Sequence, residues 1–256
     1  MEYTAAYHTD VGISKKTNQD SLAIKIIDTP DGQVTFAVVC DGMGGLAKGE
    51  LASKELTEAF CTWFDEVFAE DAANGSFDEG ALIEQWNEII QVQNRELALY
   101  GQRNSLQLGT TISAILMYKD TYYIVHVGDS RVYHLTDRAV QLTKDQSLVQ
   151  REMDAGRLTP EQAKVDPRRS ILLQCVGASP IVEPDFMKGD IQKDTVYMLC
   201  SDGFRHQISE DEILAKLGPE ACTDAGTMKV GCAFLTELVK ERRETDNVTV
   251  VVVKAA

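Results

Sequence analysis

Seven short runs rich in β-branched and aromatic residues constrain the fold of this chain more than any other feature. Such runs are typical of β-strands, and several are separated by very short turns, as at 29–32 and 119–120. Because turns this short connect neighbouring antiparallel strands, the sheets are expected to be largely antiparallel. The predicted strands cover residues 21–27, 34–39, 111–118, 121–127, 131–136, 195–200 and 247–253.

Three longer segments, 51–68, 82–97 and 220–243, place apolar residues at helical spacing along a single stripe. The first helix is expected to begin near Leu46, after a glycine-rich turn. A helix with one apolar stripe covers one face of a sheet. The chain is therefore predicted to be an α+β protein in which two mostly antiparallel sheets pack together between helix pairs. Residues 1–256 show no convincing linker and are expected to form one domain.

The balance of charge excludes two classes of partner. Lys and Arg number 25 against 40 Asp and Glu, which gives a formal net charge of −15. Nucleic acids and anionic membranes attract clustered cations, so neither is expected as a partner. No apolar run approaches the ~20 residues of a membrane-spanning helix, the first ten residues are polar and mixed, and the six cysteines show no C-x-x-C spacing. We expect a reduced, cytoplasmic setting and a monomer.

Five aspartates lie at the ends of predicted strands. Three follow apolar runs and two precede them; they are Asp41, Asp129 and Asp202, and Asp20 and Asp246, respectively. In an antiparallel sheet the end of one strand lies beside the start of its neighbour, so these acids can gather at one edge. Without a cation they would repel one another and raise each other's pKa. A bound divalent metal would remove that difficulty.

A simple turn is the alternative explanation for each Asp-Gly pair, and Asp31-Gly32 is expected to be only that. Five aspartates at strand ends together favour a metal site. The four histidines and six cysteines lack the spacing of a zinc site. Carboxylate oxygens suit Mg²⁺ or Mn²⁺, which retain several waters when bound.

Residues 146–170 differ from the rest of the chain. The segment is polar, contains two prolines and shows at most two short helices. In a compact domain such a stretch is typical of a lid or a binding loop.

Eight short motifs follow one another along nearly the whole chain. They are "TNQDS" (17–21), "DGMGG" (41–45), "GTT" (109–111), "VGDSRVY" (127–133), "LTKDQS" (142–147), "CVG" (175–177), "CSDGF" (200–204) and "DNVTVV" (246–251). Each motif alone is weak, but their order and spacing resemble the metal-dependent serine/threonine protein phosphatases of the PPM (type 2C) family, in its compact bacterial form.

The resemblance implies a four-layer α-β-β-α sandwich with two Mn²⁺ or Mg²⁺ ions at one end. Asp41 would bridge the two ions, and the backbone carbonyl of Gly42 would ligate one of them. Asp202 and Asp246 would hold the first ion, and Asp20 would act on it directly or through water. The ions would activate a water that attacks phosphorus, without a covalent phosphoenzyme.

The resemblance also implies a weaker third metal site at Asp129 and Asp202, and a flap beside the active site at about 146–170. Two departures from the family pattern affect the metal and phosphate positions. Lys15 stands where the family has a phosphate-binding arginine, and it supplies a point charge without a bidentate fork; Lys16 could share this role. Gln19 stands where the family has a glutamate, which should loosen one metal slightly.

Further departures flank the flap, where Asp145-Gln146-Ser147 and Gln174-Cys175-Val176-Gly177 replace the usual residues; they are expected to bear on substrate choice. The leading hypothesis is an active signalling phosphatase of phosphoproteins that opposes a cytoplasmic serine/threonine kinase, with Asp41, Asp202 and Lys15 as catalytic residues. The alternatives are an inactive phosphatase-like binding module and a phosphatase of small phosphorylated molecules.

Overall fold

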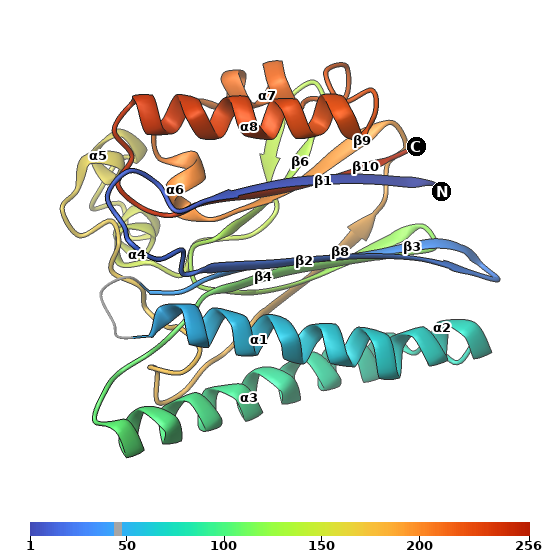
Figure 1. Cartoon of the computed structure of the whole chain (residues 1–256), viewed down its shortest axis with the longest axis horizontal. Helices are drawn as coiled ribbons and strands as arrows, with labels where there is room; N and C mark the ends of the chain where they lie inside the picture. Colours follow the sequence, from blue (N-terminus) through green and yellow to red (C-terminus); the bar gives the residue numbers. More distant parts are fainter. Residues whose placement is uncertain (44–47) are drawn as a thin grey trace.

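Two five-stranded antiparallel sheets pack face to face in the computed structural model, which describes residues 1–43 and 48–256 (Figure 1). Sheet 1 has the strand order β1 (Tyr3–Asp10), β10 (Val248–Ala255), β9 (Thr195–Cys200), β6 (Arg131–Leu135) and β7 (Ala139–Gln141). Sheet 2 has the order β2 (Asp20–Thr29), β3 (Gly32–Asp41), β4 (Ile112–Tyr118), β5 (Thr121–Val127) and β8 (Asp185–Asp190).

Helices cover the outer face of each sheet (Figure 1). Sheet 2 is covered by α1 (Gly49–Trp63), the π-helix η1 (Phe64–Phe68), α2 (Ala69–Asn74) and α3 (Glu79–Asn104). Sheet 1 is covered by α7 (Glu210–Leu217) and α8 (Ala225–Glu241), while α4 (Leu148–Asp154), α5 (Pro160–Val165) and α6 (Asp202–Arg205) lie at one end of the sandwich. The predicted α+β fold of four layers, α-β-β-α, is confirmed.

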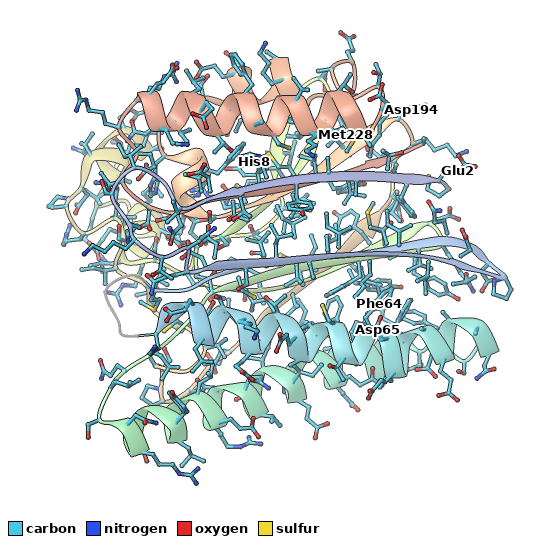
Figure 2. All side chains as sticks on the ribbon, in the orientation of Figure 1. Glu2, His8, Phe64, Asp65, Asp194 and Met228 are labelled. Atoms are coloured by element: carbon cyan, nitrogen blue, oxygen red, sulfur yellow. The ribbon has the colours of Figure 1, made fainter. Side chains whose placement is uncertain are left out.

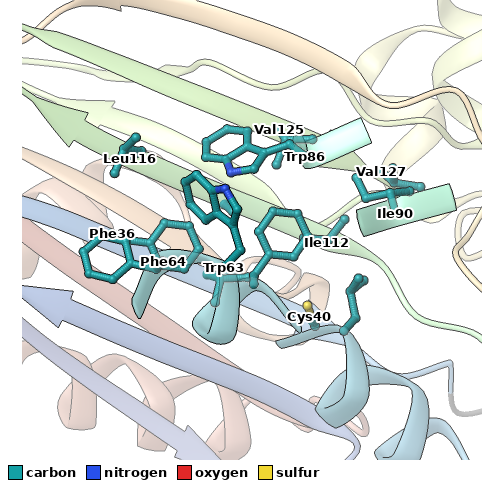
Figure 3. Close-up of a cluster of buried hydrophobic side chains, with 14 of the residues drawn as sticks. Phe36, Cys40, Trp63, Phe64, Trp86, Ile90, Ile112, Leu116, Val125 and Val127 are labelled. Atoms are coloured by element: carbon teal, nitrogen blue, oxygen red, sulfur yellow. The ribbon is translucent and has the colours of Figure 1, made fainter. Parts of the chain in front are cut away.

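Three apolar clusters hold the layers together. The largest joins sheet 2 to its helices through stacked and edge-on aromatic rings, among them Phe36, Trp63 and Trp86 (Figure 3). A second joins sheet 1 to α6, α7 and α8, and a third fills the space between the sheets. Phe64 and Met228, both fully buried, lie between helix and sheet on the two sides (Figure 2). The regular strands are therefore fixed on both faces, which gives their ends a rigid base.

Three strands in the described part of the chain escaped sequence prediction, and all three are edge strands: β1, β7 and β8. An edge strand pairs on one side only and needs no continuous apolar run; the fourth edge strand, β2, was predicted because it has one. The third predicted helix starts at Ala225 and not at 220, because Asp224 caps its N-terminus in a capping box with Thr227. The helix start predicted near Leu46 lies outside the described residues.

Within residues 1–43 and 48–256, no helix has the length and apolar character needed to cross a membrane. The six cysteines are all unpaired, and five of them are buried. They pack as small apolar side chains in this fold.

Candidate metal centre

The β2–β3 hairpin places two of the predicted ligands opposite each other. Asp20 at the start of β2 pairs in register with Asp41 at the end of β3. The end of β3 is held by the neighbouring segment: Asp41 N donates to Thr111 Oγ1 (3.0 Å), and Thr110 Oγ1 donates to the Asp41 carbonyl (2.9 Å). The "GTT" motif therefore fixes the backbone of the residue on which the predicted centre depends.

Gly42 lies where two backbone segments approach closely. Its N–H donates to the carbonyl of Gln19 (3.0 Å). A Cβ at position 42 would come 2.5 Å from that same carbonyl oxygen and would also collide with the carbonyl oxygen of Gly49. Only glycine fits this position without moving backbone, since real Cβ contacts are longer than this.

Sheet 1 supplies two more of the predicted ligands. Asp202 opens α6 two residues after β9 ends, and Asp246 lies two residues before β10 begins. A hydrogen bond from Ser201 Oγ to Asp20 Oδ2 (2.9 Å) links this side of the centre to sheet 2. Asp129, which follows β5, is only 5% exposed. The sandwich thus brings carboxylates from both sheets to one end.

Burial and mutual repulsion change the acidity of this cluster. Burial, and then the charges of Asp20, Asp202, Asp129 and Asp246, raise the pKa of Asp41 well above its ordinary value. Burial, with smaller contributions from Asp202 and Asp246, raises the pKa of Asp20 to about 7, although hydrogen bonds from hydroxyl groups oppose the shift. Five carboxylates close enough to affect one another in this way favour a bound cation.

Asp129 shows the same behaviour with one opposing charge. Burial and the charge of Asp202 raise its pKa to about 7, while the guanidinium of Arg205 lowers it. Asp129 therefore lies near both a carboxylate and the guanidinium of Arg205.

The residues present fit a divalent metal in two respects. Asp20 Oδ1 is buried and has no hydrogen-bond partner among the described residues, which is costly unless a cation lies nearby. All the side-chain donors are hard carboxylate oxygens, the ligands that Mg²⁺ and Mn²⁺ prefer. Among the described residues, no group of three or more His, Cys, Asp or Glu side chains forms a ready-made shell for an ion.

Lys15 lies at the edge of the cluster, in the loop between β1 and β2. Its Nζ forms an ion pair with Asp246 Oδ1 (2.9 Å), and its side chain is 29% exposed. Lys16, its neighbour, is exposed. The cation predicted to bind substrate phosphate is therefore close to the centre, but here it pairs with a predicted metal ligand.

Sequence reasoning missed a pair of residues behind the ligands, the buried Glu244 and the partly exposed His206. Glu244 Oε1 accepts hydrogen bonds from the backbone N–H groups of Thr245 (2.7 Å) and Asp246 (3.1 Å). Its other oxygen lies 3.6 Å from His206 Nδ1, and His206 Nε2 lies 3.7 Å from Asp202 Oδ2. Glu244 and His206 thus span the two ligand-bearing segments of sheet 1. The only sequence signal was their position within four residues of a predicted ligand.

The segment 146–170 contains two short helices, as predicted, each with a side-chain cap. Its first residue is tied to the centre: Gln146 N donates to the carbonyl of Gly128 (2.7 Å), and Gly128 N donates to Gln146 Oε1 (2.8 Å). Since Gly128 precedes Asp129, the root of this segment is fixed directly beside the carboxylate cluster.

Comparisons with known proteins agree with this geometry. The family model described as protein phosphatase 2C matches residues 11–227. The serine/threonine phosphatase stp of Listeria monocytogenes is 33% identical over 82% of this chain and 81% of its own length. The serine/threonine protein phosphatase PstP of Mycobacterium tuberculosis is 33% identical over 96% of this chain, which spans only 44% of that protein's length.

Solved structures show the same likeness in three dimensions. The structure of serine/threonine phosphatase Stp1 from Staphylococcus aureus is 28% identical, with a TM-score of 0.83 over 100% of this chain and 96% of that chain. The catalytic domain of PstP, in complex with two manganese ions, is 29% identical, with a TM-score of 0.78 over 98% and 97% of the two chains. By sequence and by fold, this chain belongs to the protein phosphatase 2C family of metal-dependent serine/threonine phosphatases.

Proposed function

We propose that residues 1–256 form one catalytic unit that hydrolyses phosphoserine and phosphothreonine on proteins with two Mn²⁺ or Mg²⁺ ions. The single observation that carries the proposal is Asp41, whose negative charge is destabilised by the negative charges of the four other aspartates predicted from the sequence. The family's metal dependence and the two manganese ions in the PstP catalytic domain support it.

In this proposal Asp41 and the backbone carbonyl of Gly42 would help to hold the two ions. Asp202 and Asp246 would hold one ion from the side of sheet 1, and Asp20 would act on it directly or through water from the side of sheet 2. When bound, the ions supply a water of lowered pKa as the nucleophile and offset charge on the phosphoryl group.

Lys15 has the role of binding substrate phosphate. Its contact with Asp246 keeps the ammonium at the edge of the centre, where it can turn from that carboxylate to a phosphoryl oxygen. The segment 146–170, rooted beside Asp129, acts as the flap that admits the phosphoprotein. The substrate is a phosphoprotein modified by a serine/threonine kinase in the cytoplasm; the relatives named serine/threonine phosphatases support this class of substrate.

Hydrolysis of p-nitrophenyl phosphate and of a phosphothreonine peptide, each with Mn²⁺, with Mg²⁺ and with EDTA, tests the proposal. Metal-dependent turnover of both substrates is expected. Turnover of the aryl phosphate alone would favour a phosphatase of small molecules. No turnover by folded protein that binds Mn²⁺ would favour a phosphatase-like binding module.

A further inference from the structure

A largely buried arginine, Arg205, lies beside Asp129, where the family resemblance implies a third ion. Arg205 Nη2 donates to the backbone carbonyl of Asp129 (3.0 Å) and lies 3.7 Å from Asp129 Oδ2. The two side chains are only 12% and 8% exposed. The guanidinium therefore touches the candidate third-site ligand from inside the protein.

The fold holds this guanidinium in place. Arg205 Nη2 also lies 3.3 Å from Asp145 Oδ2, and Arg131 binds the same carboxylate in a bidentate pair (2.7 and 2.8 Å). The four-residue helix α6 begins at Asp202 and ends at Arg205, so the element that delivers a predicted metal ligand also delivers the cation. The ion pair of Arg205 is less exposed than that of Lys15. The side chains of Arg205 and Asp129 are 12% and 8% exposed, whereas those of Lys15 and Asp246 are 29% and 40% exposed.

A fixed guanidinium and a dication compete for the same carboxylate. Arginine stays charged at every physiological pH. An ion held by Asp129 and Asp202 would lie within a few ångströms of that charge, in a buried region where screening by solvent and salt is weak. Resting on the two-ion function proposed above, we propose that Arg205 takes the place of the third cation, so this chain binds two divalent ions and not three.

Counting bound Mn²⁺ tests this without reference to turnover. The electron paramagnetic resonance signal of free Mn²⁺ is followed while each protein is titrated with the metal. We expect the wild type to bind two ions per chain and Arg205→Gln to bind three. The third Mn²⁺ of the variant should bind at least about tenfold more tightly than any additional Mn²⁺ binds to the wild type. Glutamine keeps a donor for the Asp129 carbonyl, and Asp145 keeps its pair with Arg131.

Three further variants sharpen the count. Arg205→Lys keeps the charge and should stay at two ions. Arg138→Gln removes an arginine from the exposed turn between β6 and β7 and should also stay at two. In the Arg205→Gln background, Asp129→Asn should remove the third ion.

Two results would overturn the inference: an unchanged count in folded Arg205→Gln, or three ions in the wild type that fall to two in Asp129→Asn. The second measurement decides the matter even where Arg205→Gln fails to fold, because Asp129→Asn alone is expected to leave the wild-type count at two. Wild-type protein that binds no Mn²⁺ would overturn the proposed function and, with it, this inference; three ions in the wild type would overturn only the role of Arg205.

Discussion

The negative charge of Asp41 is destabilised by the negative charges of all four other candidate ligands. Asp41→Asn keeps its size and removes that charge, so it should lower kcat/KM for p-nitrophenyl phosphate in Mn²⁺ by about a thousandfold, or ~4 kcal/mol. The matched control is Asp31→Asn in the turn at the opposite end of β3, where Asp31 pairs with Lys119. A wild-type rate in Asp41→Asn would remove Asp41 from the centre.

Lys15 forms an ion pair with Asp246 in the structure and is proposed to bind the substrate phosphate during turnover. Lys15→Ala should raise KM for p-nitrophenyl phosphate by about tenfold with a smaller change in kcat, because a charge-assisted hydrogen bond to phosphate contributes about 1.5 kcal/mol. Lys16→Ala, one residue along and exposed, is the control and should have the smaller effect. Equal KM values for wild type and Lys15→Ala would leave Lys15 only its ion pair with Asp246.

At the scale of single elements, the end of β3 depends on a close backbone approach. Gly42→Ala forces a Cβ against the carbonyl oxygens of Gln19 and Gly49, so the β3 end must shift. We expect a loss of about 1–3 kcal/mol in the free energy of unfolding, together with weaker Mn²⁺ binding, measured by thermal melting and metal titration. Gly80→Ala in α3 is the control, since its Cβ would meet only the side chain of Asp78 at 3.2 Å. Equal melting temperatures for the two variants would contradict the argument.

The proposed flap, residues 146–170, is the second segment with a testable consequence. Val165 at the end of α5 is 79% exposed, so a charge there costs little stability. Val165→Asp should lower kcat/KM for a phosphothreonine peptide by at least about threefold, through repulsion of the phosphoryl charge, while changing p-nitrophenyl phosphate hydrolysis less. The control is Val230→Asp, since Val230 is 69% exposed on α8, the helix that covers sheet 1. This variant should leave kcat/KM unchanged for both substrates. Parallel losses on both substrates would argue against a flap that selects proteins.

At the scale of the whole molecule, the metal-free centre couples stability to pH. The folded-state pKa values of Asp20 and Asp129 are raised from 3.8 to about 7. Folded protein therefore holds protons that unfolded protein releases. This contribution to stability is fully present below about pH 4 and is lost as pH rises through about 7.

The difference between the melting temperatures of Mn²⁺-loaded and EDTA-treated protein should therefore increase by a few degrees or more from about pH 5 to about pH 8. Other titrating groups act on both forms and largely cancel in the difference. A difference that stays constant with pH would show that metal does not replace protons on these carboxylates.

The buried strands and the covering helices could be predicted from the sequence because their signals are local. Alternation and apolar runs mark strands that are covered on both faces, and α1 and α3 carry one apolar stripe each. The edge strands β1, β7 and β8 could not be predicted in the same way as the edge strand β2, because β7 has only three residues and β1 and β8 lack the apolar run of β2.

The candidate ligands were visible in the sequence because Asp41, Asp129 and Asp202 interrupt apolar runs. Only the tertiary structure joined Asp20 on sheet 2 to Ser201 on sheet 1, and only it placed Arg205 beside Asp129, 76 residues away. Local propensity depends on neighbours a few residues apart, so it fixes where a charge leaves a strand. Which other charged side chain lies beside that residue depends on how the two sheets pack. Contacts of this kind join residues far apart in the chain, so they leave no short-range sequence pattern.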